Sequence, residues 1–127
     1  MITYFGLYDE VLIDCLFRNL GDGGFAYQGL TDLADARTGL GVIVADFDQQ
    51  FGNEMFIAND SLPNRLWKFG VDDPSVDRPV DLATVLGCAY AFSGGATGAM
   101  GIAVGDFDRD SKMDFFWGVA IFQRQIM

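Results

Sequence analysis

An internal repeat constrains the fold of this chain more than any other feature. Residues 41–48 read GVIVADFD, and residues 101–108 read GIAVGDFD. The similarity continues past the aspartates in the same alignment, because residues 54–57 (EMFI) fall on residues 114–117 (DFFW). Self-similarity at such a period is typical of repeat architectures, in which each repeat is one supersecondary unit.

A second internal similarity has a spacing of 50 residues, whereas the first has a spacing of 60. Residues 16–18 (LFR) resemble residues 66–68 (LWK). Unequal spacings mean that the unit varies in length, and we place the insertion in residues 70–100.

The segments between the repeated loops are typical of strands. They are short, apolar and rich in β-branched or aromatic residues, and they are bounded by Gly, Asn, Asp or Pro. The expected strands are 25–28, 42–45, 55–58, 64–68, 102–104 and 115–119. Two stretches, 31–37 and 80–86, are expected to form single helical turns closed by Gly39 and Gly87. The sequence contains no long amphipathic helix.

The predicted fold class is all-β, with about four strands per cycle, which is the size of a β-propeller blade. Residues 1–40 are expected to form a partial blade, residues 41–100 a complete blade with an insertion, and residues 101–127 another partial blade. A repeat unit cannot bury its faces alone. We therefore expect an excerpt of a larger, incomplete propeller, with self-association through open sheet edges.

Composition excludes several functional classes. The chain has 127 residues, 18 acidic and 8 basic side chains and no histidine, with a net charge of -10. Nucleic-acid binding needs clustered Lys and Arg, so we expect no nucleic-acid partner. Without histidine, a Ser-His-Asp or Cys-His nucleophile and a His-ligated metal are excluded. Carboxylate chemistry, oxygen-ligated cations and pure binding remain.

Membrane insertion and cysteine chemistry find little support. The longest apolar run, 115–122, is 8 residues long, whereas about 20 are needed to span a bilayer. Residues 1–16 carry three acidic side chains but no Lys or Arg, so no signal peptide is expected in this chain. Cys15 and Cys88 form no C-x-x-C motif. Buried free thiols are favoured over a disulfide.

The second acidic loop, 106–114, reads DFDRDSKMD. Aspartates stand at loop positions 1, 3, 5 and 9: Asp106, Asp108, Asp110 and Asp114. Such carboxylates suit Ca²⁺, which takes six to eight oxygens, whereas two carboxylates 5 Å apart repel by roughly 3 kcal/mol at an effective dielectric of 20. An EF-hand is rejected, because position 12 is Trp117 rather than Glu. An acidic turn without an ion is the alternative.

The first acidic loop, 46–54, is a weaker candidate. Its ligands at the same positions would be Asp46, Asp48, Gln50 and Glu54. Gln50 offers only a neutral amide oxygen. At position 2, Phe47 and Phe107 are expected to pack beneath their loops as core residues.

The repeated residues resemble a known family. Residues 44–48 and 104–108 are similar to the FG-GAP/VCBS repeats of integrin-α-like β-propellers. Residues 16–25, together with Ala58-Asn59-Asp60 and Pro63-Asn64-Arg65-Leu66, resemble the connectors of bacterial proteins that pair these repeats with an ASPIC/UnbV domain, a group that includes the cartilage acidic proteins. The resemblance covers residues 16–117.

This resemblance implies a secreted or cell-surface propeller that holds Ca²⁺ in its hairpin loops. It implies adhesion or binding of a protein or carbohydrate ligand rather than catalysis, with the eight loop residues named above as metal ligands. The glycine that the family has at loop position 6 is replaced by Ser111 and Phe51. A carboxylate-using carbohydrate-active enzyme fragment and a non-functional truncated product remain as alternatives; a glycosidase needs two carboxyl groups about 5–9.5 Å apart.

Overall fold

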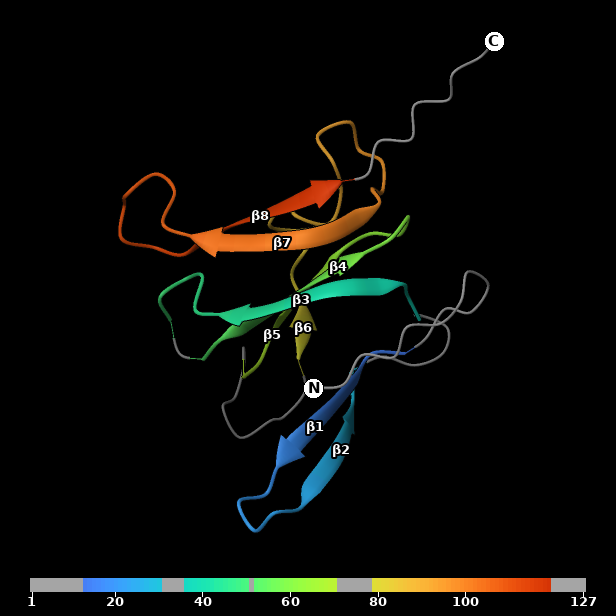
Figure 1. The fold of residues 1–127 in the computed structure, drawn as a ribbon, viewed down its shortest axis with the longest axis vertical. Coiled ribbons are helices and arrows are strands. Elements are labelled where there is room, and N and C mark those ends of the chain that lie inside the picture. Colours follow the sequence, from blue (N-terminus) through green and yellow to red (C-terminus); the bar gives the residue numbers. More distant parts are fainter. Residues whose placement is uncertain (1–12, 31–35, 51, 71–78, 120–127) are drawn as a thin grey trace. The chain divides into compact units, whose positions relative to one another are not determined.

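The computed structural model describes residues 13–30, 36–50, 52–70 and 79–119. Within these ranges the protein is all-β, with eight strands and no helix, which confirms the predicted fold class (Figure 1). The chain divides into two compact units, Met1–Gly39 and Leu40–Met127. No helix in the described part is long and apolar enough to cross a membrane.

The described residues of the first unit form one antiparallel hairpin. Strands β1 (Cys15–Asn19) and β2 (Phe25–Gly29) pair with Phe17 opposite Tyr27, and these two rings meet edge to face at 5.7 Å. The turn between the strands uses Gly21 and Gly23, whose φ angles of 83° and 89° suit residues without a side chain. This confirms the predicted strand 25–28. The helical turn expected at 31–37 falls largely outside the described residues.

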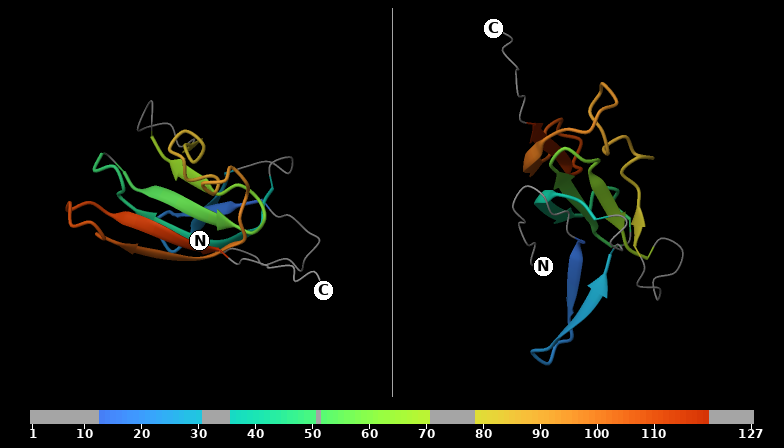
Figure 2. Two further views of the ribbon diagram at one scale, coloured as in Figure 1. Left: turned by 90° about the horizontal axis from the view of Figure 1, so that it is seen from above. Right: turned by 90° about the vertical axis from the view of Figure 1, so that its right-hand side faces the viewer.

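The second unit contains a four-stranded sheet and a further hairpin. Strands β3 (Gly39–Ala45), β4 (Glu54–Asn59), β5 (Arg65–Lys68) and β6 (Val80–Asp81) lie in chain order in the sheet. Strands β7 (Ala99–Gly105) and β8 (Asp114–Val119) pair antiparallel as a separate sheet. The loops of the β3–β4 and β7–β8 hairpins lie at the same end of this unit (Figure 2).

The second repeat contains one extra residue, which appears as a bulge. Thr38-Gly39 recurs as Thr97-Gly98 and Gly41 recurs as Gly101, so one residue separates the two glycines in the first copy and two separate them in the second. The pairing of β7 with β8 shifts register between Ala99 and Gly101. A β-bulge absorbs one additional residue without changing the rest of the ladder.

The core joins the sheet to the second hairpin through aromatic rings. Phe56 on β4 is fully buried, and its ring centroid lies 4.5 Å from that of Phe115 and 5.6 Å from that of Trp117, both on β8. Because Phe115 and Trp117 are two residues apart on a strand, they share one face, and that face packs on the sheet. Burial of each such side chain contributes about 1.5–3 kcal/mol.

The turn between β4 and β5 is held by two buried amides. Asn59 donates a side-chain hydrogen bond to the carbonyl of Pro63 (2.9 Å), and its backbone N–H donates to Asn64 Oδ1 (3.0 Å). Asn64 Nδ2 reaches the carbonyl of Cys88 at 3.2 Å. Buried polar groups must be paired, so these residues fix the turn predicted between the two strands.

One predicted element is corrected. Val80–Asp81, expected at the start of a helical turn, is strand β6. The cause is tertiary: Asp81 Oδ1 accepts hydrogen bonds from the backbone of Leu66 (3.1 Å) and of Ala83 (3.0 Å), which ties this segment to β5. A single turn remains after it, closed by Gly87 with a φ of 75°.

Both cysteines are free thiols in the structure. Cys88 is buried in the core of the second unit, and this burial raises the pKa of its thiol to about 11. Cys15, on β1, is half-buried. The high pKa keeps Cys88 protonated at neutral pH, so it behaves as a small apolar core residue.

Candidate metal centre

Each acidic loop gathers three carboxylates around one point. In each group, one oxygen from every carboxylate lies within 4.8 Å of the others. The groups are Asp46, Asp48 and Glu54 in the first loop, and Asp106, Asp108 and Asp114 in the second. Six of the eight predicted ligands therefore come together as two matched clusters at equivalent positions of the repeat.

Backbone N–H groups orient the second cluster. Each carboxylate accepts one such bond: from Ser111 to Asp106 Oδ2 (3.1 Å), from Asp110 to Asp108 Oδ1 (3.0 Å) and from Phe107 to Asp114 Oδ2 (2.9 Å). Among the described residues, no hydrogen bond or ion pair uses the other oxygen of these carboxylates. The backbone thus fixes each carboxylate through one oxygen, and the other oxygen remains available to a ligand.

The first cluster repeats this arrangement. Its carboxylates accept bonds from Gln49 to Asp46 Oδ1 (2.7 Å), from Gln50 to Asp48 Oδ1 (3.0 Å) and from Phe47 to Glu54 Oε2 (2.9 Å). Two of the three bonds join equivalent positions of the two loops. The repeat therefore extends from the sequence to individual hydrogen bonds.

The backbone turns through left-handed conformations in both loops. At position 4, Gln49 and Arg109 have φ angles of 56° and 64°. At position 6, where the family has glycine, Ser111 has a φ of 68°. That position therefore does require the left-handed region in the second loop, and a serine adopts it at some cost in strain. Phe51, the residue at position 6 of the first loop, lies outside the described residues.

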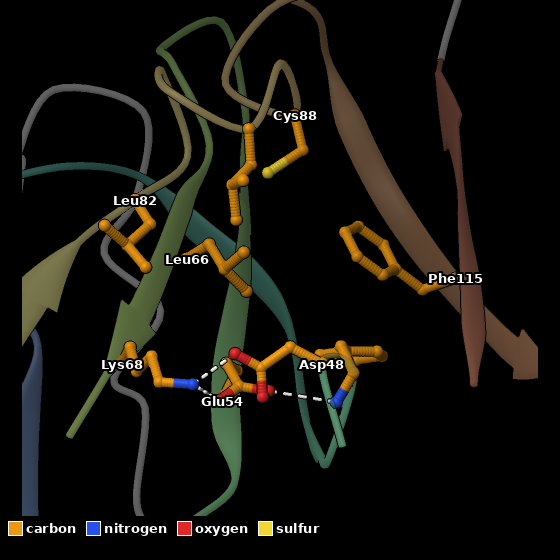
Figure 3. A pocket seen from close by; sticks show the side chains of 9 residues that line it. Asp48, Glu54, Leu66, Lys68, Leu82, Cys88 and Phe115 are labelled. Atoms are coloured by element: carbon orange, nitrogen blue, oxygen red, sulfur yellow. Dashed lines mark hydrogen bonds and ion pairs between the residues drawn. The ribbon is translucent and has the colours of Figure 1, made fainter. Parts of the chain in front are cut away.

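A lysine distinguishes the first loop from the second. Lys68, at the end of β5, donates a short hydrogen bond to Asp48 Oδ2, and its Nζ lies 3.2 Å from Glu54 Oε1 in an ion pair (Figure 3). Asp48 Oδ2 and Glu54 Oε1 are the carboxylate oxygens that accept no backbone hydrogen bond. The Lys68 ammonium therefore occupies the position where a cation would bridge the two carboxylates.

The pKa shifts reflect this contact. The hydrogen bond from Lys68 lowers the pKa of Asp48 against the opposing effect of burial. Burial acts to lower the pKa of Lys68, but the bonds to Asp48 and Glu54 outweigh it and raise that pKa. Glu54 is only 3% exposed, and a carboxylate so deeply buried requires a compensating charge. Lys68 supplies it.

Two predicted ligands lie outside the clusters. Asp110 instead accepts a hydrogen bond from the backbone of Lys112 (2.9 Å), and its carboxylate lies 3.6 Å from Lys112 Nζ. Gln50 contributes its backbone N–H to Asp48, as described above. The left-handed turn at Arg109 explains why alternate residues of the loop do not all converge on one point.

Sequence reasoning missed Lys68. Lys68 pairs directly with Glu54 in the β4–β5 register, so the signal was present once these two strands were expected to be neighbours.

The two loops touch each other. Gln49 Nε2 donates a hydrogen bond of 3.2 Å to the carbonyl of Ser111.

The phenylalanine rings at position 2 of the two loops differ in their environment. Phe47 packs against Phe115 with a centroid separation of 4.8 Å, as expected, whereas Phe107 is 62% exposed. The expectation for Phe107 is wrong, because β8 offers a packed sheet beneath the first loop but nothing in the described residues covers the second.

Comparisons with protein-family models, with curated proteins and with solved structures find no match to this chain.

Proposed function

We propose that this protein is a non-enzymatic calcium-binding repeat module for adhesion or ligand binding. The observation that carries the proposal is the second acidic cluster, where Asp106, Asp108 and Asp114 converge within 4.8 Å without a basic partner in the described residues. The first cluster, with the same architecture, contains the Lys68 ammonium at the corresponding point. A cation is therefore what this arrangement of oxygens accommodates.

The chemistry of the second cluster favours a hard cation. Ca²⁺ takes six to eight oxygens at about 2.3–2.6 Å in flexible geometry. The three carboxylates supply oxygens whose orientation is already fixed by the backbone, and water with loop carbonyls would complete the shell. Mg²⁺ suits the loop less, because it demands near-octahedral geometry and gives up water reluctantly.

The electrostatics argue against a glycosidase at the first loop. A general acid needs a carboxyl group whose pKa is raised. Lys68 shifts the pKa of Asp48 in the opposite direction. Each acidic group here also lies within one hairpin loop rather than across a cleft, which favours cation binding over acid–base chemistry.

The wider proposal concerns the parent architecture. A four-stranded sheet in chain order, followed by a hairpin that repeats its first two strands, supports blades of a β-propeller. We propose that the chain is an excerpt of an extracellular or cell-surface propeller that binds a protein or carbohydrate ligand. The FG-GAP/VCBS resemblance and the two acidic clusters support this assignment.

Calcium titration with a matched pair of variants tests the metal site. Binding to the folded state raises stability by about 2.7 kcal/mol at a free ligand concentration one hundred times Kd. We expect the melting temperature of the chain to rise with calcium and Asp108→Asn to abolish most of that rise. Asp22→Asn is the control, because Asp22 also accepts a bond from the backbone two residues on, from Gly24 N at 2.8 Å, but lies in the β1–β2 turn. An unchanged transition in the parent chain would leave an acidic turn without an ion.

A further inference from the structure

We propose that strand β1 of a second copy of this chain pairs with the outer edge of β8, and that Arg18 of that copy occupies the second acidic cluster as Lys68 occupies the first. The pairing would complete β7 and β8 into a four-stranded sheet. Four observations support this pairing: the edge of β8, the similarity of β1 to β5, the charge of Arg18 and a pocket beside Phe115.

The edge belongs to β8. Strand β4, its counterpart one repeat earlier, is flanked by β3 on one side and β5 on the other. Within the described residues β8 pairs with β7 alone. Unpaired N–H and C=O groups along such an edge are a template for another strand.

The matching strand is β1. Residues 16–18 (LFR) on β1 correspond to residues 66–68 (LWK) on β5. Strand β1 is therefore the counterpart of β5 in the sequence, just as β7–β8 is the counterpart of β3–β4.

The β4–β5 register fixes the expected alignment. Glu54 pairs with Lys68, Met55 with Trp67 and Phe56 with Leu66. Transferred by the two repeat alignments, the pairs between β8 and β1 of the second copy are Asp114 with Arg18, Phe115 with Phe17, and Phe116 with Leu16.

This register brings opposite charges together. Arg18 would stand opposite Asp114 and beside Asp108, the counterparts of Glu54 and Asp48. The oxygens that Lys68 contacts in the first loop, Asp48 Oδ2 and Glu54 Oε1, have equivalents in the second loop that no described residue engages. A guanidinium forms two-pronged hydrogen bonds with carboxylates more readily than an ammonium does.

The register also fills a pocket. A pocket of about 290 Å³ lies between Phe115 and the apolar side chains of Leu66, Leu82, Leu86 and Cys88 (Figure 3). Directly opposed residues of an antiparallel pair lie on the same face, so Phe17 of the second copy would lie beside Phe115, over this pocket. Tyr27, which pairs with Phe17 across the β1–β2 hairpin, would lie beside Phe17 on the same face. Phe17 and Tyr27 are 40% and 56% exposed in the chain.

The contact is head to tail, which limits the assembly. Such interfaces give closed rings when the rotation closes and open fibres when it does not.

A charge exchange on the full chain tests the pairing. Analytical ultracentrifugation of the parent chain, over a dilution series with EDTA, should show a closed oligomer. Arg18→Glu should weaken assembly about tenfold or more, as should Asp108→Arg, because each places like charges together. The double variant Arg18→Glu, Asp108→Arg restores the complementary pair and should reassemble. Asp22→Arg, which reverses a charge at an exposed turn residue of the same unit, should assemble like the parent.

Recovery in the double variant separates a lost contact from a misfolded chain. A monomeric parent chain, full assembly of Arg18→Glu, or no recovery in the double variant would each overturn the proposal. Hydrogen exchange of the β8 amides adds a second readout, with protection expected only in the oligomer. Protected β8 amides in a monomer would show that the chain covers its own edge. Because these measurements contain no calcium, their failure is distinct from failure of the calcium site.

Discussion

Lys68 holds Asp48 in the first acidic loop by a short charged hydrogen bond, and its Nζ also lies 3.2 Å from Glu54 Oε1. Both carboxylates are oriented by backbone N–H groups through their other oxygen. The first loop therefore carries a built-in cation from the neighbouring strand. The second loop has the same arrangement of carboxylates, and no basic side chain of the described residues reaches its cluster.

Replacing Lys68 by methionine should open the first loop to metal. Breaking a buried ion pair by removing one partner costs about 3–5 kcal/mol, so Lys68→Met should lose much of that amount in EDTA. Calcium should restore part of it, and calorimetric titration should show about one additional calcium site. Lys112→Met, which removes an exposed lysine from the second loop, serves as the control. An unchanged stoichiometry in Lys68→Met would contradict a shared cation position.

The same pair should shape the pH dependence of stability. The lowered pKa of Asp48 contributes stability above its ordinary value of 3.8, and that contribution disappears as pH falls through the lower folded pKa. The raised pKa of Lys68 contributes stability below its ordinary value of 10.5, and that contribution disappears as pH rises through the higher folded pKa. Urea unfolding from pH 2 to 11.5 should show both limbs in the parent and weaker limbs in Lys68→Met. Limbs of equal steepness would assign the pH dependence to other groups.

Removing the Asn64 amide should destabilise the second unit. Asn64 is almost fully buried, accepts a bond from Asn59 N and donates one to the carbonyl of Cys88. Leaving such buried groups unpaired costs about 1–3 kcal/mol each. We expect Asn64→Ala to lower the free energy of unfolding by about 2–4 kcal/mol, measured in urea. Asn53→Ala, at an exposed position, should change it by less than about 0.5 kcal/mol.

Calcium and assembly should oppose each other. The proposed Arg18 contact uses the same oxygens of Asp108 and Asp114 that would bind Ca²⁺, and two ligands for one site are negatively linked in both directions. Saturating calcium should therefore dissociate the oligomer seen in EDTA, and the assembled chain should bind calcium more weakly than a variant that cannot assemble. Sedimentation with and without calcium measures this. Stronger assembly in calcium would mean that Arg18 and the metal do not share oxygens.

Local sequence signals were enough to predict much of the strand pattern. Apolar runs such as residues 55–58 lie between a loop of aspartates and an Asn/Pro turn, and strands formed there. The repeat also predicted that Asp46 and Asp106 would begin equivalent loops, because the same turn chemistry recurs at the same spacing. These features depend on neighbours within a few residues, which a sequence displays directly.

Other features depended on contacts distant in sequence. Val80–Asp81 forms a strand because the carboxylate of Asp81 accepts a hydrogen bond from the backbone of Leu66. Asp110 lies outside the second cluster because the backbone adopts a left-handed conformation at Arg109.

The residues of the two loops alone determined that each would gather carboxylates. Only tertiary structure decided that their charges would differ, because the cation of the first loop comes from Lys68 on a strand paired beside it. A charge reaches a carboxylate through space, and its position in the sequence does not reveal the strand that will carry it there.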